Sequence, residues 1–346
     1  MRGIAFLTAV LVVLAAAAER AGALQPADRD AGGTRIELRV EPAVALWTEA
    51  RALAESRTEA SGPLAPLIDS MRALGTKLPP GRWGQFDSAL LGVTDAEEIA
   101  ERLSGVSTLR LRDGAEVEVG AELERVLDSL VDLEPRFREE LWPRRRELVD
   151  AARTDIENRL LPKQDEAFGA MLRALGMSDP GRTIPVYLVH SSVWPGAVTY
   201  RDRDGTGYCI VAVDREENRG SALLEIILHE ATHALDSAAA QSASRNVLSR
   251  LRERLREAGL GPADDAFRDL PHTIMFVQAG ETIRRVVDPE HVHYGDGPST
   301  YYDRVRHARL VRDLWIAHLD GELPLDEVLD RLVAAATGPE NAPAEG

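Results

Sequence analysis

The spacing of apolar residues predicts a largely helical chain between residues 41 and 178. Apolar side chains recur there at steps of three and four, which places them on one face of an α-helix. Pro143 and Pro162 fall inside the last helical stretch, and each must interrupt or kink it because proline lacks the amide hydrogen. The clearest repeats are Ala43, Leu46, Trp47, Ala50 and Leu53, followed by Leu64, Leu67, Ile68, Met71 and Leu74.

Two shorter elements are predicted within this helical part. Asp95 is placed to cap a helix that runs through Leu103, and Glu98, three residues later, completes a capping-box pattern. Apolar residues then alternate from residue 108 to residue 119, as they do in strands. A hairpin that turns at Asp113-Gly114 accounts for this alternation.

The pattern changes after residue 181. Residues 184–189, 197–201 and 207–213 are short runs rich in strand-forming residues, separated by turn residues, and each predicts a strand. A strongly helical run begins at Ser221. This part of the chain therefore combines strands with helices.

Together these patterns predict an α+β fold that is predominantly helical. We expect a helical N-terminal region at residues 41–178 and a second domain at residues 179–335, with a small mixed sheet and further helices. Ser299 or Thr300 is expected to cap a last long helix of that domain. Residues 336–346 are expected to be a flexible tail.

The N-terminus has the three parts of a secretory signal peptide. Arg2 is followed by an apolar run from Ile4 to Ala18 and by the small residues Ala21-Gly22-Ala23. The run is shorter than the roughly 20 residues that span a bilayer. We expect residues 1–23 to be removed and the protein to be secreted or periplasmic, with an uncleaved anchor as the alternative. Residues 24–40 are expected to be a polar linker.

Composition and charge narrow the possible partners. The chain has 41 Lys and Arg against 57 Asp and Glu, a formal net charge of −16. This balance argues against nucleic acid and anionic membrane surfaces, which require positive charge. No segment after the signal peptide is apolar enough to span a membrane. Cys209 is the single cysteine, which excludes an intramolecular disulfide and a cysteine-rich zinc site.

The helical run that begins at Ser221 carries the candidate chemistry. His229 and His233 enclose Glu230 in a His-Glu-x-x-His motif. Positions four apart lie one turn apart on the same helix face, so both imidazoles can bind one Zn²⁺, and Glu230 can reach a water on that metal. The alternative is a pair of surface histidines on an ordinary helix.

With this motif on an apolar helix that follows several strands, the chain resembles the zincin metallopeptidases over roughly residues 184–318. The resemblance implies an antiparallel edge strand whose backbone pairs with an extended peptide substrate. Residues 207–213 are our candidate for that strand. The chain departs from the metzincin pattern, which places Gly and a third His where Asp236 and Ala239 stand, and is more similar to the gluzincin subgroup.

Gluzincins take their third zinc ligand, a Glu, from a downstream helix. Glu281 is the candidate because it follows an apolar stretch, and a buried carboxylate requires a partner. The alternative is that Glu281 pairs with Arg284 or Arg285 one turn on. Four other downstream residues are reserve ligands: Asp288, Glu290, His291 and His293.

The remaining site residues are candidates for supporting a ligand or stabilising the oxyanion. Asp236, three residues after His233, is a candidate to accept the ring N–H of a metal-bound histidine and so orient it, or else is a plain surface Asp. Tyr294 and Tyr301 are candidate catalytic donors to the oxyanion of the transition state. Tyr302, His293 and His307 are further candidates for that role, whereas His190, His272 and His318 look like ordinary histidines.

The sequence therefore predicts an exported zinc metallopeptidase that acts on peptides or proteins, with Glu230 as the general base. Two alternatives remain open. One is a zincin-like binding or scaffold domain that holds metal without turnover. The other is a zinc hydrolase of a non-peptide amide. The helical N-terminal region is a pro-region, a lid or a docking module in this hypothesis.

Overall fold

Four strands form one mixed sheet in the order β1-β4-β6-β5. Both β1 and β6 run parallel to β4, and β5 runs antiparallel to β6. All but the first residue of β4 are buried, as expected for a strand inside a covered sheet. The bounds are β1 Arg35–Arg39, β4 Thr183–Val189, β5 Ala197–Arg201 and β6 Gly207–Ala212.

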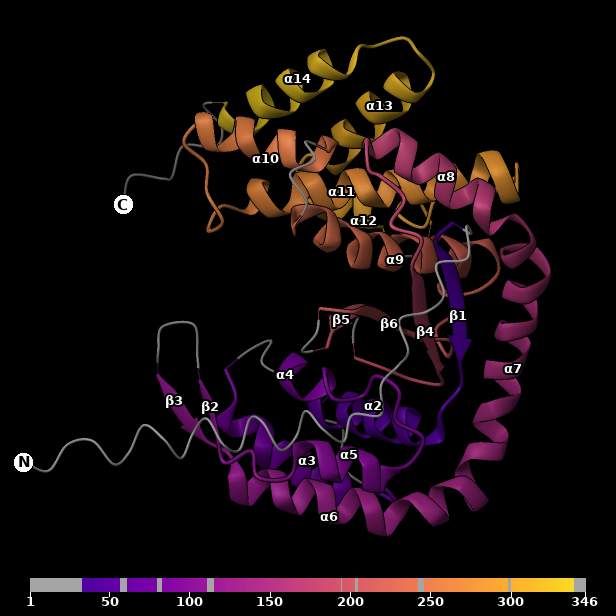
Figure 1. Cartoon of the computed structure of the whole chain (residues 1–346), viewed down its shortest axis with the longest axis vertical. Helices are drawn as coiled ribbons and strands as arrows, with labels where there is room; N and C mark the ends of the chain where they lie inside the picture. Colours follow the sequence, from indigo (N-terminus) through magenta and orange to yellow (C-terminus); the bar gives the residue numbers. More distant parts are fainter. Residues whose placement is uncertain are drawn as a thin grey trace, which may run out of the picture. The chain divides into compact units, whose positions relative to one another are not determined.

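These elements come from a computed structural model, shown in Figure 1. It describes residues 33–56, 61–79, 83–110, 115–193, 195–202, 205–241, 246–297 and 300–338. The expected signal peptide, most of the expected linker and most of the expected tail lie outside these residues. Of the tail, the last turn of a helix reaches Thr337. None of the described helices is both long and apolar enough to cross a membrane.

Strand β1 corrects the expectation of a linker at residues 24–40. Its residues pair with β4 from Arg35 opposite Thr183 to Arg39 opposite Tyr187. The strand looks like a linker in sequence because every second residue is charged, and in the structure only Ile36 of its five residues is buried. The pairing joins part of the predicted linker to the sheet of the second predicted domain, and Thr34 onward forms a single compact unit.

The helices of the N-terminal region follow the predicted pattern. Asp95 caps its helix by accepting a hydrogen bond of 2.9 Å from the Glu98 N–H, as predicted. The predicted hairpin is present as β2 and β3, and its turn lies outside the described residues. The bounds are α2 Pro42–Glu55, α3 Ala65–Lys77, α4 Gly84–Asp87, α5 Ala96–Leu103, β2 Thr108–Arg110, β3 Glu116–Glu118 and α6 Gly120–Arg136.

The two prolines interrupt the following helical stretch, as predicted. A π-helical segment, Phe137–Leu141, joins α6 to α7 (Trp142–Arg159), and Pro143 lies in the first turn of α7. Pro162 lies in a 3₁₀ turn that separates α7 from α8 (Gln164–Leu175). Proline is tolerated at such first-turn positions because their N–H has no partner within the helix.

The C-terminal part packs helices around α9, which lies on strands β5 and β6 and beside α11 (Figure 1). The expected last long helix is two helices, α12 and α13. His307 separates them with a left-handed backbone, and Thr300 forms no capping bond. The bounds are α9 Ser221–Gln241, α10 Val247–Glu257, α11 Asp265–Thr282, a π-helical segment Ile283–Val287, α12 Tyr301–Arg304, α13 Ala308–Leu319 and α14 Leu325–Thr337.

The edge strand of the sheet differs from the predicted one. Strand β6, within residues 207–213, lies between β4 and β5 and is paired on both sides. The free edge next to α9 belongs to β5, which has no second partner among the described strands. The reason is the hairpin of β5 and β6: the chain runs along the edge of the sheet in β5 and returns in β6, between β5 and β4.

Candidate metal centre

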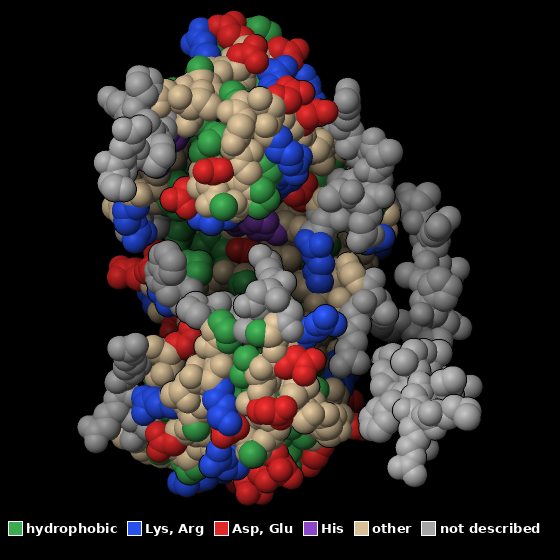
Figure 2. Space-filling model, turned by 90° about the vertical axis from the view of Figure 1, so that its left-hand side faces the viewer, with side chains coloured by type: hydrophobic (Ala, Val, Ile, Leu, Met, Phe, Trp, Pro, Cys, Tyr) green, Lys and Arg blue, Asp and Glu red, His purple; other side chains and the backbone are tan. Residues whose placement is uncertain are grey.

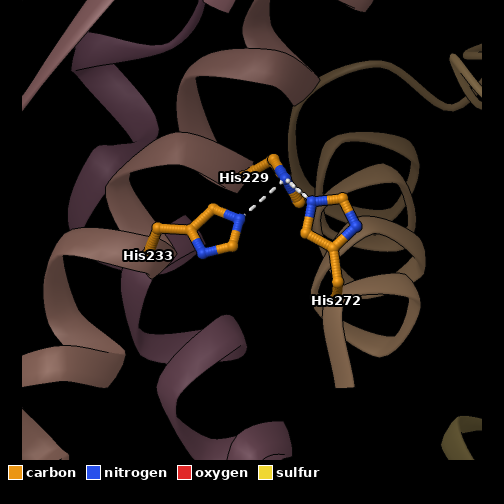
Figure 3. Close-up of side chains that lie close together, drawn as sticks. All are labelled: His229, His233 and His272. Atoms are coloured by element: carbon orange, nitrogen blue, oxygen red, sulfur yellow. Dashed lines mark hydrogen bonds between the residues drawn. The ribbon is translucent and has the colours of Figure 1, made fainter. Parts of the chain in front are cut away.

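Three histidine side chains converge from two helices. His229 and His233 lie one turn apart on α9, and His272 faces them from α11 (Figure 3). Nε2 of His229 lies 3.1 Å from Nε2 of His233 and 3.2 Å from Nε2 of His272. Among the described residues, this is the group of three whose ligand atoms all lie within 4.8 Å of one another.

The geometry suits one small metal ion. Zn–N bonds of about 2.0–2.1 Å in tetrahedral geometry place two ligand nitrogens about 3.3 Å apart. The two Nε2 distances from His229 are close to that value. Three neutral nitrogen donors are a zinc-type set and leave a fourth position for water or substrate.

The electrostatics of the site keep the three imidazoles neutral. Burial lowers the pKa of His229 well below its ordinary value of 6.5, and the neighbouring His233 and His272 lower it further. Burial, with the charges of nearby His272, Arg252 and Arg201, lowers the pKa of His233 to about 3. Burial lowers the pKa of His272 to about 4. At neutral pH the rings therefore carry lone pairs that a cation can bind.

The helices hold this cluster between a packed core and solvent. On α9 the neighbours Leu224, Ile227 and Leu228 are fully buried, and His229 itself is 3% exposed. His233 and His272 are partly exposed. Histidine side chains are visible at a hollow on the face drawn in Figure 2. The cluster therefore packs against the core on the side of His229, while His233 and His272 reach the surface.

Glu230 is held by the edge strand β5. The Thr199 hydroxyl lies 2.6 Å from Oε2 of Glu230 and 2.7 Å from its backbone carbonyl oxygen. Burial raises the pKa of the Glu230 carboxyl to about 7, although the hydrogen bond from Thr199 opposes the rise. A carboxyl group with a pKa near neutrality is suited to accepting and returning a proton.

Glu281 is not at the histidine cluster, which corrects our expectation for the third ligand. Its carboxylate accepts hydrogen bonds from Arg284, Arg285 and His293, so the alternative pairing with the arginines is the one observed. His272 and Glu281 are nine residues apart on α11, which separates them by about 13 Å along the helix axis. At the cluster, His272 lies where we expected Glu281.

Tyr301 also differs from expectation. Its hydroxyl lies 2.9 Å from Nδ1 of His272, on the side of the ring away from His229, and 3.0 Å from Oγ1 of Thr273. Burial raises its pKa to about 12, so the hydroxyl stays protonated. The structure thus places Tyr301 behind a histidine of the cluster and does not place it as an oxyanion donor.

Tyr294 is one ring removed from the cluster. Its ring packs on Phe276 at 5.6 Å between centroids, and Phe276 packs on His229 at 4.6 Å. Its backbone N–H donates to Glu225. Of the other oxyanion candidates, Tyr302 and His293 contact each other at 3.3 Å.

The reserve ligands and Asp236 have other partners. Asp236 forms an ion pair of 3.2 Å with Arg252 of α10. The side chains of the reserve ligands are placed as follows: His291 bonds to Glu225, His293 to Glu281 and Asp288 to Arg159, and Glu290 is exposed.

His272 is the site residue that the sequence analysis missed. A signal was present, because the buried apolar run that drew attention to Glu281 begins just after His272, with Ile274. A helix that buries residues 273–282 also holds the position before them against the core. Sequence spacing alone offered no way to align His272 with a motif 39 residues upstream.

Comparisons with models of protein families, with curated proteins and with solved structures found no match for this chain.

Proposed function

We propose that this protein is an exported zinc hydrolase of the zincin type that cleaves peptide bonds. The observation that carries the proposal is the convergence of three histidine Nε2 atoms, together with Glu230, which follows His229 on α9 and whose carboxyl group is held by the Thr199 hydroxyl of β5. The proposed ligands are His229, His233 and His272, three nitrogens in place of the two nitrogens and one carboxylate expected of a gluzincin. Export rests on the signal-like residues 1–23.

The chain's own residues supply positioning and proton transfer in this proposal. Bound zinc would supply a Lewis acid that lowers the pKa of water and polarises a carbonyl group. Glu230 accepts the proton of the attacking water and returns it to the leaving amine. Thr199 keeps the Glu230 carboxyl in place during both transfers, because its hydroxyl bonds to one carboxyl oxygen.

The edge strand supports a peptide as the substrate. β5 is paired with β6 on one side, and an extended peptide can add as a further strand on the other. Thr199 lies in the middle of β5, so the strand that would align the peptide also holds the general base. This link favours a hydrolase over a metal-binding scaffold, since a scaffold does not require a positioned base.

The replacement Glu230→Gln tests the proposal. It keeps the side-chain volume and the three histidines but removes the proton acceptor. We expect the purified full chain to retain one zinc and to lose at least about 100-fold in the hydrolysis of a fluorogenic peptide library. Glu257→Gln, the same change at an exposed position of α10, is the matched control. Full hydrolysis by Glu230→Gln would refute the catalytic assignment.

A further inference from the structure

A short chain of hydrogen bonds extends from His272 away from the proposed zinc position. Nδ1 of His272 lies 2.9 Å from the Tyr301 hydroxyl, which lies 3.0 Å from Oγ1 of Thr273. The Thr273 hydroxyl in turn lies 2.7 Å from the backbone carbonyl oxygen of Asp269, one turn earlier on α11. The chain ends at a group that can only accept, because a carbonyl oxygen carries no hydrogen.

That end fixes the direction of every bond. The Thr273 hydroxyl has one hydrogen and donates it to the Asp269 carbonyl. Its oxygen therefore accepts from Tyr301, whose single hydrogen is then used. The Tyr301 oxygen is left to accept from His272, so Nδ1 of His272 carries the ring hydrogen and Nε2 carries the lone pair.

We propose that Tyr301 is a positioning residue that holds His272 in the tautomer able to bind metal through Nε2. A neutral histidine has two tautomers, and the other one would point an N–H at the cluster in place of a lone pair. The inference rests on the proposed zinc site. It replaces the sequence-based hypothesis that Tyr301 stabilises the oxyanion.

The packing around Tyr301 suits this role. Its ring is stacked on Phe276, with centroids 4.8 Å apart and planes at 25°. Phe276 packs on His229 in turn, so one aromatic ring braces both Tyr301 and a histidine of α9. Tyr301 begins the short helix α12, the next α-helix after α11, which brings its hydroxyl back to α11.

His229 provides the contrast within the same cluster. Its Nδ1 is buried and has no hydrogen-bond partner among the described contacts. Partners of this kind orient metal-bound histidines and typically change metal affinity by 10- to 100-fold when removed. Of the two histidines, His272 is therefore the one whose outer partner can be tested by substitution.

The replacement Tyr301→Phe removes the acceptor and keeps the stacked ring. We expect zinc affinity, measured by competition with a chelator, to fall by about 10- to 100-fold. Tyr302→Phe is the matched control, because it removes a hydroxyl that contacts His293, which lies outside the cluster. Equal zinc affinity in wild type and Tyr301→Phe would overturn the inference.

A second readout separates this inference from the proposed function. Nitrogen-15 NMR of the histidine rings in the metal-free protein should show His272 protonated at Nδ1 in wild type and a mixture of tautomers in Tyr301→Phe. A wild-type chain that binds no zinc would refute the proposed function. The tautomer of His272 in the metal-free protein would still test the role of Tyr301. An Nε2-protonated His272 in wild type would overturn that role.

Thr273→Val tests the same chain of hydrogen bonds without changing Tyr301, so the inference stays testable if Tyr301→Phe does not fold. Valine matches threonine in shape, and Tyr301 stays in place. The tyrosine hydrogen, having lost its acceptor, can then turn toward Nδ1 of His272 and favour the wrong tautomer. We expect zinc affinity to fall in this variant too, and an unchanged affinity would contradict the proposed direction of the bonds.

Discussion

Replacing Glu281 by glutamine separates two explanations of a buried carboxylate. As a zinc ligand, Glu281 would be needed for metal binding. In the structure it is 1% exposed and bonds to Arg284, Arg285 and His293, far from the histidine cluster. We therefore expect Glu281→Gln to keep its zinc affinity within twofold of wild type and to lose stability.

The expected loss follows from the bonds that change. Hydrogen bonds to charged groups contribute about 1.5–3 kcal/mol each. Arg284 and Arg285 keep 39% and 38% of their side chains exposed, so after the substitution both can return to water. Glutamine also keeps one acceptor oxygen. We expect a net loss of about 2–3 kcal/mol in the free energy of unfolding at pH 7, which urea denaturation can measure.

The pH dependence provides a further check with a definite sign. Burial alone would raise the pKa of Glu281, but the bonds from His293, Arg284 and Arg285 outweigh it and hold the pKa well below the usual range. A carboxyl group with a lowered pKa stabilises the fold above its unfolded value of about 4.3, and that contribution is lost as the pH falls. The difference between wild type and Glu281→Gln should therefore shrink below about pH 5. Lost zinc with unchanged stability would refute this reasoning.

Three other results are expected. Thr199→Val should lower the peptide hydrolysis rate by about tenfold and leave zinc content unchanged, because it removes the hydrogen bond to the Glu230 carboxyl and leaves the three histidines in place. An unchanged rate would argue against positioning of Glu230 by β5. The metal-free protein should lose stability as the pH falls from 6.5 toward 4, because His272 takes up a proton when unfolded but not when buried in the fold. His272→Phe should therefore reduce the dependence of the unfolding free energy on pH by up to about 1.4 kcal/mol per pH unit. The same dependence in wild type and His272→Phe would contradict the lowered pKa of His272. Deleting residues 1–40 should give insoluble protein, because it removes β1 from beside β4; a soluble product with native circular dichroism would show that β1 is dispensable.

Periodicity predicted much of the fold because most elements are amphipathic or carry local signals. Asp95 and its helix, the hairpin and the three later strands were all recoverable from spacing and turn residues. Strand β1 was not recoverable, because its alternation of charged and apolar residues covers five residues and its partner β4 lies 148 residues downstream. Pairing over such distances is a property of the folded sheet.

The candidate site shows the same division between local and distant information. His229, Glu230 and His233 share one helix, so their arrangement follows from helical geometry. The position of His272 depends on how α11 packs against α9, which no sequence spacing encodes. We preferred Glu281 as a ligand because a buried carboxylate requires a partner. Glu281 is buried and has partners, but they are two arginines and a histidine, not the cluster.

A three-histidine zinc centre predicts the metal content of the purified protein and of its histidine variants. Elemental analysis of wild type, His272→Ala and His318→Ala should show about one zinc per chain in the first and third proteins and little in the second. His318 is a suitable control because its ring bonds to the Leu323 backbone carbonyl, away from the cluster. Equal zinc in His272→Ala, or no zinc in wild type when zinc is supplied, would refute a zinc centre built on His229, His233 and His272.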